Sequence, residues 1–223
     1  MKVRETIAHP PGHPTGSVLA QAANPHVSLN GFRLDDLATF TREHSFPAND
    51  SPDFRVLYAG RDDVHGALAY LLARCSRSLR FNMFGYDDDA LDQIVRGLVA
   101  SEHVFVQGTL DKSQAAGVHE RKILAGWDQA MRNSFAIGQS ATHQISHTKG
   151  GVIDGVVAWE GSTNWSASGE GTIVATDGSD VGRKSQNNTC AFYVHPVQVA
   201  RFIDELDHEH AVALAQQTKA AAG

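Results

Sequence analysis

Apolar residues recur along the middle of the chain with two alternating spacings. In some segments they repeat every three or four residues, which is typical of a helix with one buried face; in others they form short β-branched and aromatic runs, which favour strands. These spacings predict strands at 55–59, 79–84, 104–107, 134–137, 144–149 and 189–194, and helices at 34–40, 64–75, 91–99, 113–131 and from Pro196 onward. Asp62 or Asp63 precedes the second helix and Asp87-Asp88-Asp89 the third, where a carboxylate can cap the first turn. Strands that alternate with helices indicate an α/β sandwich.

The stretch from Val152 to Trp159 has the composition of a β-hairpin. Its two apolar runs are joined by Asp154-Gly155, a favoured two-residue turn. His147 and Lys149 lie two residues apart on the predicted incoming strand, so their side chains leave the same face. Gly161-Ser162-Thr163-Asn164 follows the second strand, and the hairpin returns that segment to the side of His147.

The two ends of the chain differ from this middle part. Residues 1–53 contain a proline-rich stretch, His9–Pro14, and one short predicted helix, so we expect them to form an N-terminal extension. We expect residues 54–215 to form one compact domain and residues 216–223 to form a frayed tail.

The composition is ordinary for a globular protein, with 42% hydrophobic and 20% charged residues in a chain of 223. No stretch has the apolar length that a membrane span needs, and the N-terminus lacks the apolar core of a signal peptide. We therefore expect a cytoplasmic protein without stable membrane association. Cys75 and Cys190 fall on apolar positions and are expected to be buried thiols, with neither a disulfide nor a metal site.

His147, Lys149 and Asp154 form an H-x-K-x4-D string, which the G-S-T-N segment Gly161–Asn164 follows. Imidazole supplies a nucleophile, lysine supplies a positive charge, and an amide with a hydroxyl supplies neutral donors. This set suits attack on a phosphodiester, because the attack places negative charge on oxygens that ammonium and amide groups stabilise. A bare H-x-K would carry little information in a chain with 12 histidines, whereas the combination of these defined positions in one short segment is specific.

At these residues the chain resembles the phospholipase D superfamily, whose signature is H-x-K-x4-D followed by G-S-x-N. The resemblance runs from about Phe54 to about His210, which is most of the chain. It implies an α-β-α sandwich with a mixed central sheet flanked by helices. It also implies hydrolysis through a covalent phosphohistidine, without a metal ion or another cofactor.

The resemblance also implies a role for each residue of the two motifs. His147 is the expected nucleophile, and Lys149 and Asn164 are expected to bind the phosphate oxygens. Ser162 adds a donor to the phosphate, and Asp154 organises the catalytic site without attacking.

The chain contains one copy of the motif, whereas the family's reaction uses a second histidine, from a second copy, to protonate the leaving oxygen and then activate water. No other histidine of the sequence stands in an H-x-K context; His119 and His143 are examples. A two-fold axis would bring two His147 side chains together, since a residue near such an axis meets its own copy. The sequence therefore predicts a homodimer with one composite site, in which one imidazole is neutral and the other protonated.

One segment departs from the family pattern. Members commonly carry a glutamate on a later strand, shortly after an asparagine, that orients the catalytic histidine. The corresponding segment here, Gln186–Tyr193, contains no acidic residue. Asn188 or Thr189 is a candidate to accept the imidazole N–H, and Glu170 is a candidate to replace the acid from a loop.

The sequence constrains the substrate less than the reaction. A formal net charge of −6 does not by itself indicate a nucleic-acid protein. Arg183 and Lys184, however, fall in a loop expected to rim the site, where with Lys149 of both chains they would line a positive groove. Small single-motif family members that dimerise are often nucleases, so the resemblance favours a metal-independent nuclease acting on DNA or RNA. The alternatives are a phospholipase D-type hydrolase of lipids or small phosphodiesters, and a non-catalytic phosphate-binding or scaffolding module.

Other polar or aromatic clusters have plainer explanations. Asp207–His210 resembles a metal tag, but a helix points these side chains in different directions, so a solvated face is favoured. His143 and His147 lack a third ligand at zinc spacing. Trp159 and Trp165 flank the G-S-T-N segment and are expected in a packed core or dimer interface in preference to stacking on bases.

Overall fold

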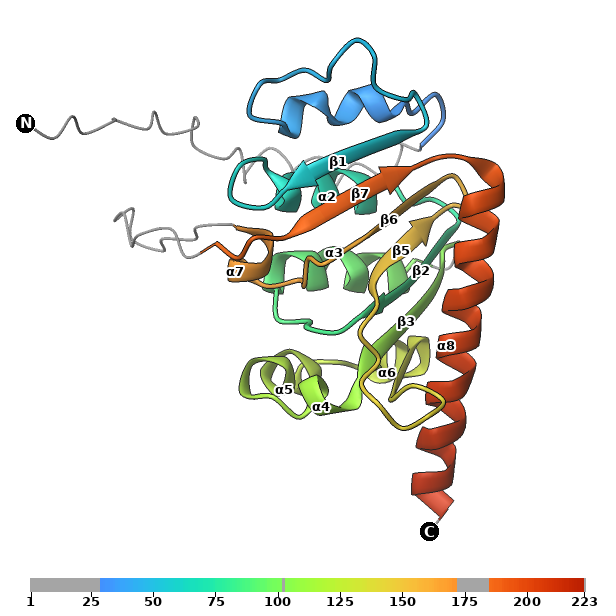
Figure 1. The fold of residues 1–223 in the computed structure, drawn as a ribbon. Coiled ribbons are helices and arrows are strands. Elements are labelled where there is room, and N and C mark those ends of the chain that lie inside the picture. Colours follow the sequence, from blue (N-terminus) through green and yellow to red (C-terminus); the bar gives the residue numbers. More distant parts are fainter. Residues whose placement is uncertain (1–28, 102, 172–184, 223) are drawn as a thin grey trace, which may run out of the picture.

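The centre of the structure is a seven-stranded mixed sheet (Figure 1). The computed structural model describes residues 29–101, 103–171 and 185–222. The strand order is β1-β7-β6-β5-β2-β3-β4, with bounds β1 Phe54–Tyr58, β2 Ser78–Met83, β3 Phe105–Asp111, β4 Phe135–Gly138, β5 Lys149–Ile153, β6 Val157–Gly161 and β7 Thr189–Tyr193. β2, β3 and β4 are parallel, and all other neighbouring strands are antiparallel. The predicted mixed sheet is confirmed.

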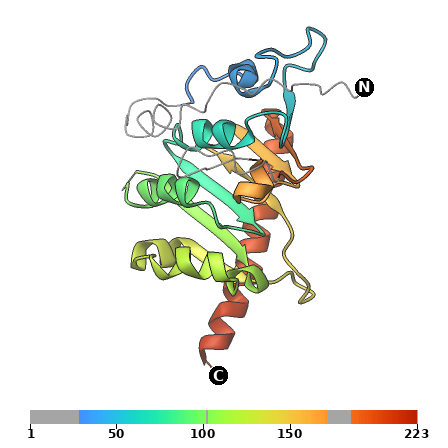
Figure 2. The same cartoon turned by 90° about the vertical axis from the view of Figure 1, so that its left-hand side faces the viewer.

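Helices cover both faces of this sheet (Figures 1 and 2). On one face lie α2 (Val64–Leu72), α3 (Asp89–Val99), α5 (Val118–Ala125) and α6 (Gln129–Ser134); α8 (Pro196–Ala222) crosses the other. The side chains of β5 alternate between the two layers: Ile153 packs in the core with α2 and α3, while Val152 packs with Phe202 of α8. The predicted α-β-α sandwich is therefore confirmed.

Aspartate caps fix the starts of the two longer helices on the first face. The carboxylate of Asp63 accepts a hydrogen bond from the Gly66 N–H at 2.8 Å, and that of Asp88 accepts one from the Leu91 N–H at 2.7 Å. Each bond satisfies an N–H group that has no partner inside its helix. Both capping predictions are confirmed.

The β5–β6 hairpin closes through the predicted turn. Asp154 and Gly155 have φ angles of +57° and +68°, as this tight turn requires. Gly150 and Gly151 give β5 room against β6: a Cβ at Gly151 would lie 2.3 Å from the ring of Trp159, and one at Gly150 would lie 2.5 Å from the Trp159 backbone oxygen. The paired glycines therefore serve close packing inside the sheet.

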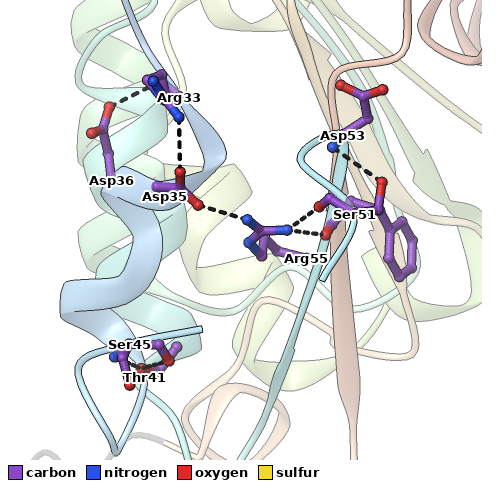
Figure 3. Close-up of polar contacts among 9 residues, drawn as sticks. Arg33, Asp35, Asp36, Thr41, Ser45, Ser51, Asp53 and Arg55 are labelled. Atoms are coloured by element: carbon purple, nitrogen blue, oxygen red, sulfur yellow. Dashed lines mark hydrogen bonds and ion pairs between the residues drawn. The ribbon is translucent and has the colours of Figure 1, made fainter. Parts of the chain in front are cut away.

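The described part of the N-terminal segment, residues 29–53, packs beside β1 and shares the main core. Its 3-10 helix η1 (Leu34–Phe40) buries its leucines there. The guanidinium of Arg55 reaches back from β1, donating to the Asp35 carboxylate at 2.6 Å and to the backbone oxygen of Ser51 (Figure 3). A buried guanidinium thus joins this part of the segment to the edge of the sheet.

The prediction of one helix over residues 113–131 is wrong, because that segment contains three. α4 (Lys112–Ala115) precedes α5, whose N-cap and C-cap are Gly117 and Gly126. Asp128 then starts α6 by accepting from the Met131 N–H at 2.8 Å. Glycine is a weak helix former and aspartate is a strong cap, so these residues interrupt an apolar spacing that is otherwise helical.

The strand predicted at residues 144–149 is also wrong. Residues 139–148 form no strand, and β5 begins at Lys149. The N–H of Ser146 donates to the Asp111 carboxylate at 2.7 Å, so a side chain takes the place of a strand partner. His147 consequently lies in an irregular segment immediately before β5.

α8 continues through Ala222, past residue 216 where we expected the chain to fray. The side-chain oxygen of Gln216 accepts from the Gln139 N–H at 2.8 Å, and its NH2 group donates to the backbone oxygens of Gln139 and Ser140. This turn of the helix therefore holds the segment that leads to His147.

The prediction of a solvated face at Asp207–His210 is confirmed for Asp207 and His208, which are exposed, and is wrong for Glu209 and His210, which contact the sheet. Glu209 accepts from the Asn82 amide at 2.7 Å, and Nδ1 of His210 lies 3.1 Å from the Thr109 hydroxyl. The packing of α8 across the sheet decides which side chains turn inward, and no local spacing reveals that packing.

The aromatic and thiol predictions agree with the structure. Trp159 and Trp165 lie in the main core with stacked rings whose centroids are 6.2 Å apart. Cys75 and Cys190 are free and buried. In the described part of the chain, no helix combines the length and the apolar content needed to cross a bilayer.

Candidate active site

Three strand ends meet at one edge of the sheet and carry the predicted chemical groups. β2 and β6 are both antiparallel to β5, so the ends of β2 and β6 lie beside the start of β5. Lys149 opens β5 and pairs with Met83, the last residue of β2. His147 precedes β5 and Asn164 follows β6. The topology therefore brings His147, Lys149 and Asn164 to the same edge.

The imidazole of His147 is accessible. The residue is exposed, and its ring packs edge-on against Phe84 with the ring centroids 4.6 Å apart. Partial burial, and then the positive charge of Lys149, lower the pKa of His147 below its ordinary 6.5. A lowered pKa keeps the imidazole neutral at pH 7, which is the form whose nitrogen can attack.

Lys149 holds its ammonium group in a largely buried position, with 5% of the residue exposed. Its Nζ donates to the His147 backbone oxygen at 2.8 Å and lies 4.8 Å from the centre of the Phe84 ring. Burial lowers the pKa of Lys149 to about 8. Within the described residues no carboxylate forms an ion pair with this ammonium. A cation without a counter-ion beside a nucleophile is suited to an anionic substrate.

Asn164 is oriented by the backbone of Gly85. The Gly85 N–H donates to Oδ1 of Asn164 at 3.1 Å. Because a backbone N–H can only donate, the atom that it meets is the amide oxygen, and the amide NH2 is left to donate elsewhere. A Cβ at Gly85 would lie 3.2 Å from Cγ of Asn164, so glycine suits this close approach.

Ser162 and Thr163 attach the segment after β6 to the neighbouring strand. The Ser162 N–H donates to the Thr189 backbone oxygen at 3.0 Å, and the Ser162 hydroxyl accepts from the Thr189 N–H at 3.0 Å. Thr163 donates its hydroxyl proton to the same carbonyl at 3.1 Å. The exposed Ser162 hydroxyl keeps its own proton available for another acceptor.

The structure separates Asp154 from the other motif residues. Asp154 lies in the turn at the far end of β5, roughly 20 Å along an extended chain from His147. Its carboxylate accepts from the N–H groups of Ser76, Arg77 and Ser78 at 3.1, 2.8 and 3.0 Å. Asp154 therefore fixes the connection between α2 and β2 against the hairpin, and its position organises the scaffold of the site.

Comparison with solved structures identifies the architecture. No protein-family model matches the chain, and no curated protein matches it. Nuc from Salmonella typhimurium, a phospholipase D family member, is similar with a TM-score of 0.52 at 15% identity, over 70% of this chain and 92% of that one. NucT from Helicobacter pylori is similar with a TM-score of 0.55 at 13% identity, over 70% and 94% of the two chains. The chain has the phospholipase D-like fold.

In this phospholipase D-like fold, the structure describes the rim of the site on the side of α8. Arg183 and Lys184, which we expected to add positive charge, lie outside the described residues. On the side of α8, a cavity of about 270 Å³ borders His147 and is also lined by Glu205 and Glu209. That wall of the site is therefore acidic.

Two of the candidates for the missing orienting acid, Asn188 and Glu170, have partners other than His147. Asn188 donates its amide to the Gly169 backbone oxygen at 2.9 Å. The Glu170 carboxylate is buried and lies 2.5 Å from Nδ1 of His65. Glu170 is consequently the partner of a different histidine, and the expectation that it orients His147 is wrong.

Sequence reasoning missed the cluster that Glu170 forms with His65 and Asp88. Nδ1 of His65 lies 2.5 Å from Oε2 of Glu170 and 3.3 Å from Oδ2 of Asp88. One possible ligand atom from each residue lies within 4.8 Å of the others, and these are atom types that bind metal ions. A protonated imidazole between two carboxylates also offsets one of their two negative charges. His65 and Glu170 are 105 positions apart, so no local spacing could reveal the contact.

Proposed function

We propose that the protein is a metal-independent nuclease that hydrolyses DNA or RNA phosphodiesters through a covalent phosphohistidine. The observation that carries this proposal is the ammonium of Lys149, which forms no ion pair with any described carboxylate, beside the accessible imidazole of His147. The NH2 group of Asn164 and the hydroxyl of Ser162 lie at the same sheet edge as further donors. The phospholipase D-like fold supports phosphodiester chemistry at this edge.

The proposed reaction has two displacement steps. A nitrogen of one His147 attacks phosphorus, the P–N bond forms, and the P–O bond to the leaving group breaks. A second imidazole, protonated at the start, gives its proton to the leaving oxygen. That imidazole then takes a proton from water, which attacks phosphorus and releases the first His147. Lys149 and Asn164 stabilise the charge on the remaining phosphate oxygens in both steps.

The second imidazole is proposed to come from another copy of the chain. The sequence has one H-x-K motif, and the His147 ring is exposed, so it can approach a two-fold axis. Ile145, two residues earlier, is an exposed apolar side chain with 48% of its surface accessible. An isologous contact there would pair both residues with their own copies.

The activity is tested with purified protein in EDTA, incubated with plasmid, single-stranded DNA, RNA and phosphatidylcholine vesicles beside His147→Ala. Cleavage of a nucleic acid that His147→Ala abolishes supports the nuclease. Choline release that the same variant abolishes would instead support a lipid hydrolase. An absence of turnover on every substrate would contradict the proposal and favour a phosphate-binding module.

The composite site is tested by mixing wild-type and His147→Ala chains under conditions that exchange subunits. If one reaction needs both copies of His147, only wild-type homodimers are active, and total activity follows the square of the wild-type fraction. Independent sites would give activity in linear proportion to that fraction. A linear dependence, or a monomer with full activity, would therefore contradict the shared site.

A hydrolase of small phosphodiesters is the second candidate, and one observation favours it. Glu205 and Glu209 line the cavity beside His147, and carboxylates there repel a polyanion but attract a cationic leaving group such as choline. Glu205→Gln should then weaken the turnover of phosphodiesters that have choline as the leaving group. The nuclease proposal predicts the opposite sign, since loss of this negative charge should lower the KM for nucleic acid.

A further inference from the structure

Two chain segments that carry the proposed phosphate site are paired with each other. The segment after β2 contains Gly85, and the segment after β6 contains Asn164. The Trp165 N–H donates to the Gly85 backbone oxygen at 3.0 Å, and the Asp87 N–H donates to the Trp165 backbone oxygen at 2.8 Å. Together with the bond from Gly85 to the Asn164 side chain, these contacts make the two segments one unit.

His65 joins the two segments at a second point. It is the second residue of α2, and its Nδ1 lies 3.3 Å from Asp88, which continues the first segment and caps α3. The same nitrogen lies 2.5 Å from Glu170, which ends α7 (Ala167–Glu170) in the second segment. One imidazole therefore bridges the elements that follow both site-bearing segments.

A hydrogen-bonded link connects Glu170 to Asn164. The Ser166 N–H donates to the Asn164 backbone oxygen at 3.0 Å, and the Glu170 N–H donates to the Ser166 backbone oxygen at 2.9 Å. The Ser166 hydroxyl also accepts from the Gly169 N–H at 3.0 Å, and Asn188 holds Gly169 from its other side at 2.9 Å. A displacement of Glu170 is therefore transmitted to Asn164.

The cluster is partly buried, with the side chains of His65 and Asp88 15% and 12% exposed. The Glu170 side chain is 0% exposed, and its Oε1 has no hydrogen-bond partner in the described part of the chain. Burial by itself would lower the pKa of His65, but hydrogen bonds to Asp88 and Glu170 outweigh burial and raise it to about 10. Burial raises the pKa of Glu170 to about 7 against the effect of His65, and the charges of Asp88 and Asp87 act in the same direction as burial. Loss of the imidazolium would leave a buried carboxylate without its cation.

We propose that His65 is a positioning residue for the phosphate site: through Asp88 and Glu170 it holds both segments in place and so fixes the Asn164 amide relative to Lys149. This role rests on the proposed function, because a phosphate is what the Asn164 amide would bind. His65 contacts Asp88 and Glu170, and it affects the phosphate site through these two residues.

A double-mutant cycle between His65→Gln and Asn164→Ala tests this role, read as kcat/KM on the nucleic acid that the wild type cleaves. If His65 acts through Asn164, His65→Gln lowers kcat/KM by roughly 10-fold or more in the wild-type background, as small misplacements of catalytic groups do. It then has little further effect once Asn164 is alanine. The same loss in both backgrounds would mean that His65 serves stability alone, and would overturn the proposal.

Two further variants keep the test decisive. His195→Gln changes an exposed histidine and should retain the wild-type kcat/KM. Glu170→Gln keeps the shape of the side chain while removing its charge, so it replaces His65→Gln in the cycle if that variant does not fold. Additive losses for Glu170→Gln and Asn164→Ala would count against the role as clearly as additive losses for His65→Gln.

Calorimetric binding of inorganic phosphate separates this role from the activity, because binding needs no turnover. Wild-type protein that binds phosphate and cleaves nothing would defeat the proposed function, and the same cycle on dissociation constants would then judge His65. Wild-type protein that neither binds nor cleaves would overturn both. Cleavage with an additive cycle would overturn the role of His65 alone.

Discussion

Lys149 combines a positive charge with a largely buried position. An ammonium group loses hydration when it is buried, which favours the neutral form, and its pKa falls to about 8. A bound phosphate would reverse this effect, because an adjacent anion favours the charged form. The buried Lys149 ammonium therefore binds an anion more strongly than a solvated ammonium would, because little water competes for it.

We expect kcat/KM to fall on both sides of neutral pH. His147 is a neutral nucleophile only above its lowered pKa, so the acid limb should lie below pH 6.5. On the alkaline side the second His147 loses the proton that it must give to the leaving oxygen, and above its pKa of about 8 Lys149 also loses its charge. Lys149→Arg should make the alkaline limb less steep above pH 8 while lowering the maximum, because a guanidinium stays charged but differs in shape. Initial rates across the pH range check this, and an alkaline limb of unchanged steepness would contradict a contribution of Lys149.

The β5–β6 hairpin serves two purposes at its two ends. One end presents Lys149 to the site, and the other end carries Asp154, whose carboxylate gathers the N–H groups of Ser76, Arg77 and Ser78. The spacing from Lys149 to Asp154 in the H-x-K-x4-D string is thus the length of one strand, β5. The strand therefore connects Lys149, at the site, to Asp154, which is held by three backbone N–H groups.

Asp154→Asn should reduce stability without changing the chemistry of folded molecules. Asparagine tolerates the positive φ of +57°, so the turn is kept while the charge that accepts the three N–H bonds is lost. We expect the free energy of unfolding to fall by about 2 kcal/mol, measured by urea denaturation. Asp50→Asn, at an exposed position, is the matched control and should change little. Unaltered stability in Asp154→Asn would contradict the anchoring role.

Gly151→Ala should also destabilise the protein, because its Cβ would lie 2.3 Å from the Trp159 ring and 2.6 Å from the Arg80 backbone oxygen. Overpacking of this kind costs about 1–3 kcal/mol. Gly97→Ala makes the same change in α3, where no atom lies within 4 Å of the new methyl group, and should stabilise by about 0.5–1 kcal/mol. Thermal melts of the two variants should therefore shift in opposite directions.

Elements with strong local signals were predictable from the sequence, and elements that depend on distant contacts were not. The Asp154-Gly155 turn and the caps of α2 and α3 are local, and all were predicted. Residues 113–131 show apolar spacing for one helix, but the breaks at Gly117 and Gly126 divide it. In the site, the motif gave the residues that meet at the sheet edge, while the cluster around His65 depends on a contact across 105 positions.

α8 acts across the whole molecule. It covers one face of the sheet, and its contacts extend from Phe202, packed on Val152, to Gln216, bonded to the segment that leads into the site. Glu209 lies between these two contacts and accepts a hydrogen bond from the Thr148 hydroxyl at 2.6 Å. Thr148 is the residue between His147 and Lys149 in the sequence. One helix therefore supports the motif from several directions.

Truncation after residue 215 should loosen the approach to the site. It removes the Gln216 side chain, which bonds the backbone of Gln139 and Ser140. We expect faster hydrogen–deuterium exchange in residues 139–146 and a lower kcat, since His147 follows that segment. Truncation after Thr218 keeps Gln216 and should leave exchange there unchanged. Equal exchange in both truncations would show that the last turns of α8 do not hold the segment.

Phe84 lies against both the His147 ring and the Lys149 ammonium. The two groups share this aromatic floor, and the ammonium is also tethered to the carbonyl of the histidine that it accompanies. When the irregular segment before β5 fluctuates, the Lys149 ammonium therefore moves together with His147. The distance between the nucleophile and the cation is kept through displacements that would separate two groups without such contacts.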